Sequence, residues 1–454
     1  MAGKQKVTDM TKGDPGTLLF KFTIPMLLGN LFQQLYNLVD SIVIGKFVGT
    51  DELGGIGCTG SLSFLIFSLG FGMATGIGVS IAMYFGANEE SKLQQAIYNS
   101  FYVILAAALM ITTVGLFFTK DILIFMKTPA ENLPFAVLYL KITTCGSAAS
   151  LFFNVVSSIM RAFGDSQTQL KFLILACVMN IILDLLFVLG FGMSVMGVGL
   201  ATVISQFIAA ICSFVTAYRS IPYFHFKRSA LIPNKAMILK NLKLGLPIAV
   251  QSSMIALSCI VLQVVVNGFG ATIVAANTAV SKIEQLVQQP FNSLSTALST
   301  YAGQNIGAGK TKRIKQGYRS GLKFILGFSL AMFIIMQCFG KQIMGIFVNQ
   351  EDVIIIGTKA LRITSYFYIF LGLIYISRGT LNGVGDAVYS AINGVLELVG
   401  RIGLSKPLTM IPFIGMWGCF LCSGLTWMLT GLVSAGRFLS GKWEKTVVSS
   451  KKLN

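Results

Sequence analysis

The chain has 454 residues, of which 54% are hydrophobic and 11% charged, and its mean hydropathy is +0.75. Soluble globular proteins do not combine so much apolar sequence with so little charge, so the composition indicates a membrane protein. A net charge of +18 would suggest nucleic-acid binding in a soluble protein, whereas in a membrane protein it is typical of basic cytoplasmic loops. We therefore expect contact with membrane lipids and no nucleic-acid partner.

Twelve apolar segments are long enough to cross a bilayer as helices, each of which needs roughly 20 residues. In chain order they are 17–43, 55–85, 94–118, 135–160, 168–190, 196–218, 241–267, 272–302, 320–339, 354–377, 387–411 and 415–437. These segments lack the short alternation of a membrane β-barrel, so the sequence predicts an all-α polytopic membrane protein. No segment between them is long enough for a soluble catalytic domain, and we expect no enzyme.

Lys and Arg residues fall mainly on one side of this arrangement. An even number of spans places both termini on the same side, and the loops and tails of that side hold 24 Lys and Arg residues against 4 on the other. The positive-inside rule therefore predicts that both termini are cytoplasmic. We expect a multi-pass protein of the inner or plasma membrane.

The two halves of the chain resemble each other. Residues 19–25 (LFKFTIP) align with 241–247 (NLKLGLP), and the Gly-Asp pair at 164–165 aligns with the pair at 385–386. Six spans per repeat give both copies the same orientation, so we expect two six-helix bundles related by a pseudo-twofold axis along the membrane normal. The predicted divisions are an N-terminal tail 1–16, a first bundle 17–218, a linker 219–240, a second bundle 241–437 and a basic tail 438–454.

Two short motifs resemble chemical sites without the surroundings that such sites need. Cys419 and Cys422 have the CxxC spacing, but they lie in an apolar segment with no second pair and no His nearby. Residues 303–311 (GQNIGAGKT) resemble a phosphate-binding loop, but the first Gly is one residue too early and no strand precedes it. We expect neither a cofactor nor a nucleotide, so active transport must draw on an ion gradient.

Four acidic residues lie inside apolar segments, where a charged side chain costs roughly 2.5–3.5 kcal/mol. Asp40 ends a polar stripe along the first segment, and Asp184 shares one helix face with Asn180 because the two are four residues apart. Two carboxylates on neighbouring helices with an amide between them can share a proton or hold Na⁺ through oxygen ligands. These residues are therefore candidates for ion coupling.

The other two acids, Glu284 and Glu397, have different surroundings in the sequence. Glu284 begins a second polar stripe, whereas Glu397 lies four residues before Arg401 and we expect these two side chains to neutralise each other. At the repeat offset, Asn180 and Asp184 align with Arg401 and Ser405, so we expect coupling in the first half. We predict a central substrate cavity lined by Gln34, Asn37, Asn154, Gln251, Glu284, Gln288 and Asn292, with adaptable Phe and Met walls.

Several motifs taken together resemble the multidrug and toxic compound extrusion (MATE) family over essentially the whole chain. They are LVDSIVIG around Asp40, RAFGD at 161–165, Asn180 with Asp184, GVGLAT at 197–202, SKIEQ at 281–285 and AGQNIGAG at 302–309. The resemblance implies twelve helices in two bundles arranged as a V. It also implies export of amphipathic, often cationic, organic compounds by antiport with H⁺ or Na⁺.

Within that family the chain is similar to the N-lobe-coupled (DinF-like) branch. The resemblance implies a cation-coupling site of Tyr36, Asp40, Tyr139, Asn180, Asp184 and Thr202, with Asp40, Asn180 and Asp184 as the ligands if the ion is Na⁺. Another branch has a Glu on the seventh helix, where this chain has Gln251. The resemblance further implies that the first helix bends at Pro25 when the acids are protonated, and a Pro leaves a backbone carbonyl unpaired at such a kink.

Other function classes also have to be weighed. A flippase of a lipid-linked or polyprenyl-linked substrate would share the superfamily fold, but we would expect a more cationic cavity and often fourteen helices. A channel or a membrane-embedded enzyme would need a permeation filter or a nucleophile with a base, and the sequence offers neither. H⁺ and Na⁺ both stay open as the coupling ion. We expect a monomer whose partners are amphipathic small molecules and membrane lipids.

Overall fold

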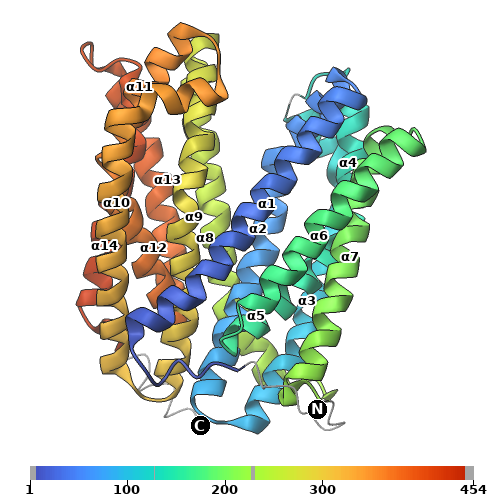
Figure 1. The fold of residues 1–454 in the computed structure, drawn as a ribbon, viewed down its shortest axis with the longest axis vertical. Coiled ribbons are helices and arrows are strands. Elements are labelled where there is room, and N and C mark those ends of the chain that lie inside the picture. Colours follow the sequence, from blue (N-terminus) through green and yellow to red (C-terminus); the bar gives the residue numbers. More distant parts are fainter. Residues whose placement is uncertain (1–6, 127, 226–230, 445–454) are drawn as a thin grey trace. The chain divides into compact units, whose positions relative to one another are not determined.

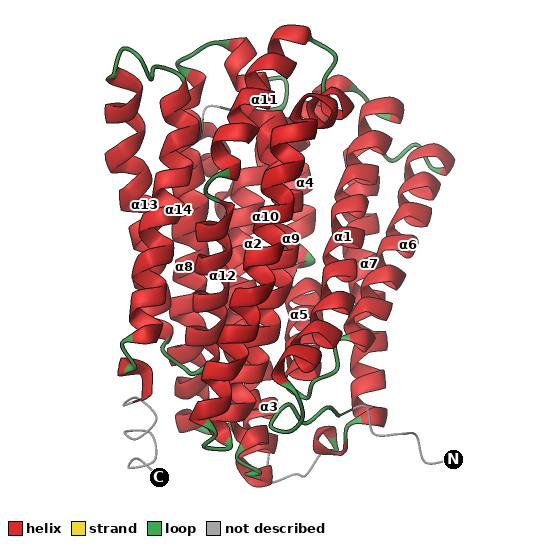
Figure 2. Cartoon of the chain, turned by 60° about the vertical axis from the view of Figure 1, so that its left-hand side comes forward, coloured by secondary structure: helices red, strands yellow, loops and turns green. Residues whose placement is uncertain are grey.

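A computed structural model describes residues 7–126, 128–225 and 231–444 (Figure 1). Across these ranges the chain is helical and contains no strand, and short loops join the helices (Figure 2). The absence of any β-structure in the described chain follows from the long unbroken apolar runs, whose backbone groups are paired within each helix. The all-α class predicted from the sequence is confirmed.

The chain forms two compact units. Unit 1 consists of Met1–Met10 and Ile24–Ala249, and unit 2 consists of Thr11–Thr23 and Val250–Asn454. The division falls inside two helices that are each continuous across it, α1 and α8. α8 begins inside the segment 219–240, where the Asn234 side chain accepts hydrogen bonds from the first backbone N–H groups of the helix.

The first half of the chain provides the helices from α1 to α7. Their bounds are α1 Pro15–Phe47, α2 Thr50–Gly86, α3 Glu90–Phe125, α4 Leu133–Cys145, α5 Ser147–Ala162, α6 Gln167–Leu185, the π-helix η1 Leu186–Gly190, α7 Ser194–Ser220 and the short 3₁₀ helix η2 Pro222–Phe224. α4 and α5 form one span that bends by 47° at Gly146. α6 and α7 lie side by side (Figure 1).

The second half repeats this order of elements. Its helices are α8 Lys235–Asn267, α9 Ala271–Gly307, α10 Thr311–Phe347, α11 Glu351–Ser365, α12 Tyr368–Gly383, α13 Ala387–Met410 and α14 Trp417–Leu439. α1 and α8 both have 33 residues, α2 and α9 both have 37, and α5 and α12 both have 16. α11 and α12 form a span bent by 54°, as α4 and α5 do. The internal repeat inferred from short motifs therefore extends to helix length and to the position of the break.

The number of membrane segments agrees with the sequence prediction. Within the described residues, eight helices are long and apolar enough to cross a membrane, and the two bent pairs bring the number to ten. The remaining two predicted spans lie in α1 and α9, which are also long enough to cross at 1.5 Å per residue. Each half of the chain thus supplies six membrane segments.

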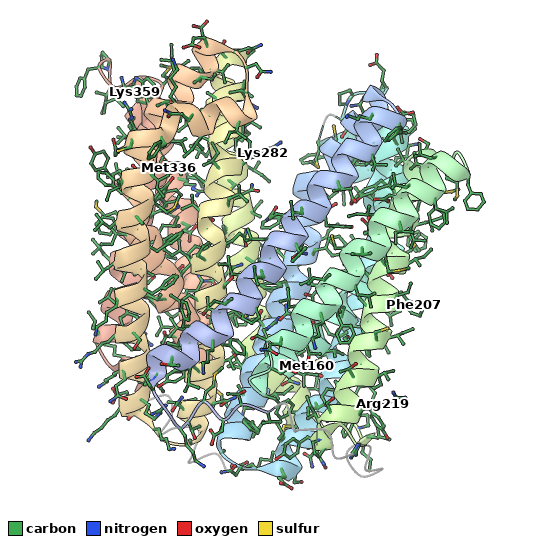
Figure 3. All side chains as sticks on the ribbon, in the orientation of Figure 1. Met160, Phe207, Arg219, Lys282, Met336 and Lys359 are labelled. Carbon is green, nitrogen blue, oxygen red and sulfur yellow. The ribbon has the colours of Figure 1, made fainter. Side chains whose placement is uncertain are left out.

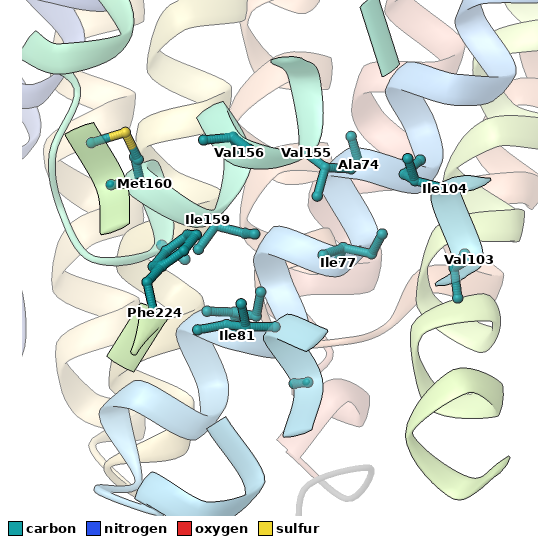
Figure 4. Packing of buried hydrophobic residues seen from close by; sticks show 14 of the residues in the cluster. Ala74, Ile77, Ile81, Val103, Ile104, Val155, Val156, Ile159, Met160 and Phe224 are labelled. Carbon is teal, nitrogen blue, oxygen red and sulfur yellow. The ribbon is translucent and has the colours of Figure 1, made fainter. Parts of the chain in front are cut away.

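Packing inside unit 1 depends on small and branched apolar side chains. α2 contributes Ala74, Ile77 and Ile81 to a buried cluster that also contains residues of α3, α5 and η2 (Figure 4). α2 approaches α8 so closely that a Cβ atom on Gly76 would lie 2.3 Å from the Cα of Gly245. Membrane helices use such glycines because close backbone approach increases van der Waals contact.

The outer surface of the helices is apolar. Phe207 of α7 is 55% exposed and projects away from its bundle (Figure 3), and Phe117 of α3 and Leu330 of α10 are exposed as well. Exposed large apolar side chains on this scale would cause aggregation in water. They suit a surface that contacts lipid tails.

Candidate ion-coupling site

The two acids of the first half meet inside unit 1. Asp40 on α1 and Asp184 on α6 have their carboxyl groups within hydrogen-bonding range of each other. Asn180, one turn before Asp184, donates from its side-chain amide to Asp40 Oδ1 at 2.9 Å and to Asp184 Oδ2 at 3.3 Å. This amide orientation is the one that satisfies the hydrogen bonds, since the reverse would place the amide oxygen against carboxylate oxygens.

Two hydroxyl groups extend this arrangement, one from Tyr36 on α1 and one from Thr202 on α7. The Tyr36 hydroxyl donates to Thr202 Oγ1 at 3.1 Å and also lies within hydrogen-bonding range of Asp40. Thr202 in turn donates to the backbone oxygen of Val198 on its own helix, at 3.0 Å. The first helix, α1, and the consecutive helices α6 and α7 therefore supply one continuous set of polar groups.

Apolar side chains surround this polar cluster. Asn180 and Asp184 have no exposed surface. Val43 and Ile44 of α1 pack with Val188 and Val198, and Tyr139 of α4 packs against the same group. Tyr139 also lies close enough to Asp40 and Asp184 to interact with their charges. Asn180 and Asp184 are therefore buried while Asp40 is half-buried, and an uncompensated charge on Asp184 is expensive.

The helix geometry next to the acids is irregular. α6 ends at Leu185 and continues as a π-helix over Leu186–Gly190, directly after Asp184. Single π-turns inside α-helices often occur at functional sites because they shift the register of the side chains that follow. Here the turn directs Val188 towards α1, where it packs on the outer side of the cluster.

The donor set suits one small cation better than a multivalent metal. No group of three His, Cys, Asp or Glu side chains comes together among the described residues. Asp184 Oδ1 is buried and has no hydrogen-bond partner among them, so an acceptor oxygen is left available to a proton or to Na⁺. The Asn180 amide presents its nitrogen to the acids, so it would have to rotate before its oxygen could bind Na⁺.

The residues predicted to line a substrate cavity divide between the two units. In unit 1, Gln34 is half-buried, Asn154 donates to the Ser150 carbonyl of its own helix at 2.8 Å, and the Asn37 side chain lies outside the described residues. In unit 2, Gln288 accepts from the Tyr375 hydroxyl at 3.1 Å. The others there are Gln251, which is 2% exposed, and the half-buried Asn292.

Glu284, the remaining predicted cavity residue, lies in a polar part of unit 2. The Thr364 hydroxyl is beside its carboxyl group, and Tyr368 and Arg401 are close enough to interact with its charge. Glu284 Oε1 is buried and has no hydrogen-bond partner within the described part of the chain. The residue thus has an unused acceptor atom, as Asp184 does.

The predicted pairing of Glu397 with Arg401 is wrong. Glu397 forms its ion pair with Arg378 of α12, N to O at 2.5 Å, and Arg378 also donates to Asn393 at 2.7 Å. Arg378 directly follows the predicted apolar segment 354–377, but it lies inside α12, which continues to Gly383. The four-residue spacing correctly makes Arg401 a neighbour of Glu397 on α13. The Glu397 carboxylate nevertheless pairs with the Arg378 guanidinium on α12.

Both halves of the chain match a known protein family. The family profile described as MatE matches residues 25–186 and 247–405, which is one stretch in each half. This chain belongs to the MATE family. The match includes Asp40, Asn180 and Asp184 of the cluster and stops before Thr202.

Curated relatives of this MATE protein are multidrug transporters by name. "Probable multidrug resistance protein YpnP" of Bacillus subtilis is 29% identical over 454 residues, covering 98% of this chain and 100% of that protein. "Multidrug export protein MepA" of Staphylococcus saprophyticus is 23% identical, covering 90% and 89%. A solved structure described as the outward-facing conformation of a multidrug resistance MATE family transporter of the MOP superfamily has a TM-score of 0.89, 22% identity and full coverage of both chains. The MATE protein is accordingly a multi-pass membrane transporter.

Proposed function

We propose that this MATE transporter exports amphipathic, often cationic, organic compounds in exchange for H⁺ or Na⁺ bound at Asp40 and Asp184. One observation carries the proposal, namely that the two carboxyl groups face each other across the Asn180 amide. Two like charges so close together in apolar surroundings repel each other, so one carboxyl must hold a proton or both must share a cation.

Exchange follows from linkage between the ion and the substrate. Ion uptake from outside would neutralise the acids, weaken binding of a cationic drug and favour the inward-facing state. Ion release inside would restore the negative charge and allow the drug to bind again. By linkage, the ion and the drug must each weaken binding of the other by the same free energy, typically 1–3 kcal/mol.

The polar residues of both halves would form the path of the substrate. We propose that Gln34, Asn37, Asn154, Gln251, Glu284, Gln288 and Asn292 line it, with Phe and Met side chains as adaptable walls. Glu284 is the one acid among them, so it would attract a cationic drug. A monomer would suffice for transport, because each half supplies its own set of these residues.

α1 would transmit the state of the ion site. It carries Asp40 and, fifteen positions earlier, Pro25 within the same continuous helix. Pro25 cannot donate a backbone hydrogen bond, so the helix can bend there at low cost. Protonation of the acids would release the contact between α1 and α6 and so permit the bend.

The second half of the chain lacks acids at the corresponding positions, which supports ion coupling in the first half, as in the DinF-like branch. There Gln251 occupies the seventh membrane segment where another branch has an acid, and Arg401 stands at the repeat position of Asn180. We also propose that both termini face the cytoplasm of an inner or plasma membrane, as the distribution of Lys and Arg favours. A single Cys is placed in each terminal tail in turn, and intact cells are treated with a membrane-impermeant thiol reagent. Labelling of either tail would place that terminus outside the cell and contradict the proposed orientation.

The deciding experiment is drug uptake into proteoliposomes that contain the purified transporter. An imposed pH gradient and an imposed Na⁺ gradient are applied separately, and a fluorescent organic cation reports movement. We expect one gradient to drive uptake against the drug concentration, with ion movement in the opposite direction. Drug uptake that does not depend on either gradient would contradict antiport. Transport of a fluorescent lipid-linked sugar in place of the drug would contradict drugs as the substrate.

A further inference from the structure

Unit 2 contains a counterpart of the ion-coupling site with the opposite charge. α8, α13 and α14 occupy the positions in the second half that α1, α6 and α7 occupy in the first. At the repeat offsets, Tyr36 corresponds to Ser258 and Asn180 corresponds to Arg401. The first half therefore has two carboxyl groups at this place, and the second half has a guanidinium.

The Arg401 side chain contacts α8, as its counterpart Asn180 contacts α1. Its Nη1 atom donates to Ser258 Oγ at 3.1 Å and to Cys259 Sγ at 2.8 Å, both on α8. α14 instead packs against the backbone of α13, where Cys422 donates to the Arg401 backbone oxygen and Thr426 packs against Gly400. The guanidinium is thus held by neutral groups of α8.

The acids of unit 2 do not neutralise this guanidinium by contact. Glu397, the nearest acid along α13, is ion-paired with Arg378, and Glu284 on α9 has the Thr364 hydroxyl beside it. In the described part of unit 2, no carboxylate forms an ion pair with Arg401. This part of unit 2 contains two guanidinium groups, Arg378 and Arg401, and two carboxyl groups, Glu397 and Glu284. Among these four described residues, only Arg378 and Glu397 form an ion pair.

One buried donor of Arg401 lacks an acceptor. Arg401 is 6% exposed, and its Nε atom has no hydrogen-bond partner among the described residues. A guanidinium has five N–H donors and accepts nothing, so the missing partner is an acceptor. Glu284 and Glu397 act on the charge of Arg401 from a distance, but neither accepts from Nε, and a bound oxyanion would supply that acceptor.

The site is also reachable from the surface of the bundle. Cys259 is exposed, and its sulfur contacts the same Nη1 atom of Arg401. A ligand that reaches Cys259 can therefore reach the guanidinium without separating α8 from α13.

We propose that Arg401 binds the oxyanion group of an amphipathic molecule, so that the second half recognises the negative end of a zwitterionic or anionic substrate. This rests on the proposed function for its role in transport and extends it by naming a substrate class. The guanidinium fork would bind a carboxylate through two parallel hydrogen bonds.

Binding of a matched probe pair to the purified full-length transporter tests the proposal. 1-Pyrenebutyrate and its methyl ester differ in the negative charge and by one methyl group, and their fluorescence is measured in phosphatidylcholine nanodiscs without any ion gradient. We expect the wild type to bind the carboxylate about 10–100-fold more tightly than the ester, as suits a hydrogen-bonded charge pair. Arg401→Gln should remove this preference, Arg401→Lys should retain part of it, and Arg362→Gln on the exposed face of α11 should leave it unchanged.

Alkylation of Cys259, followed by peptide mass spectrometry, gives a second measurement on the wild type. Bound 1-pyrenebutyrate should slow the reaction at Cys259 several-fold, because it covers the sulfur and screens the adjacent guanidinium, while the ester should not. Phosphatidylglycerol added to the nanodiscs identifies a lipid headgroup as the source of the oxyanion if it displaces the probe. Equal binding of carboxylate and ester, unchanged preference in Arg401→Gln, or unchanged alkylation would each overturn the proposal. Because no gradient is used, these results do not depend on whether Asp40 and Asp184 couple transport to an ion.

Discussion

Asn180 on α6 donates a hydrogen bond to Asp40 on α1 at 2.9 Å. The same amide reaches Asp184, so one neutral side chain holds two carboxyl groups at a fixed separation. This contact joins the helix that carries Pro25 to the helix that carries the second acid. Any change in the charge of either acid must therefore alter the attachment of α1 to α6, which is what a coupling site requires.

Asp40→Asn and Asp184→Asn should each abolish gradient-driven efflux. The replacement keeps the shape but removes the carboxyl group that exchanges its charge state, so ion binding no longer changes drug binding. Uptake is measured in proteoliposomes with an imposed gradient. Both variants should insert and purify like the wild type, because an amide is easier to bury than a carboxylate. Full efflux by either of them would refute the assignment.

Asn180→Ala should weaken coupling less than either Asp variant. It removes two hydrogen bonds and leaves both carboxyl groups in place, so we expect efflux to fall roughly tenfold. The same proteoliposome assay measures the loss. Thr75→Ala serves as control, because that exposed hydroxyl bonds only to the Phe71 carbonyl of its own helix. Complete loss of efflux in Asn180→Ala would mean that the amide is as essential as the acids.

Glu284→Gln should change which drugs are exported more than it changes coupling. One buried oxygen of the carboxyl group has no hydrogen-bond partner among the residues that the structure describes, so it can accept from a cationic ligand. We expect resistance to dicationic drugs to fall several-fold and resistance to neutral drugs to persist, measured as growth inhibition of a strain lacking its own exporters. An unchanged drug profile would exclude Glu284 from the substrate path.

Gly76→Ala should destabilise unit 1. The added Cβ would lie 2.3 Å from the Cα of Gly245, and backbone cannot move aside as a flexible side chain can. We expect a loss of about 1–3 kcal/mol in the free energy of unfolding, seen as a lower melting temperature in detergent. Gly60→Ala on the same helix meets nothing within 4 Å and should be neutral or slightly stabilising. Equal melting temperatures for the two variants would contradict the close packing of α2 against α8.

Arg378→Gln should destabilise the transporter more than removal of both members of its ion pair. The single change leaves Glu397 buried without its partner, for which we expect a loss of roughly 3–5 kcal/mol. Arg378→Met combined with Glu397→Met removes both charges and should recover much of that stability. Thermal unfolding of the wild type and of these two variants measures the difference. A double variant no more stable than Arg378→Gln would show that the pair itself stabilises the bundle.

The sequence by itself determined the membrane class, the twelve segments, the repeat and the four acids that lie inside apolar segments. Apolar length, charge asymmetry and the cost of an acid in a bilayer are all local properties, so they can be read without knowing how the helices pack. The spacing of Asn180 and Asp184 also established that both lie on one face of α6.

Only the tertiary structure decided which residues from different helices meet. The contact of Asn180 with Asp40, the partner of Glu397 and the contact of Arg401 with α8 all depend on how far each helix is rotated about its axis and shifted along it. A rotation of one residue, 100° at 3.6 residues per turn, would point each of these side chains at a different neighbour. Periodicity does not specify that rotation between helices, because it is set by the packing of small and branched side chains such as Gly76 against Gly245.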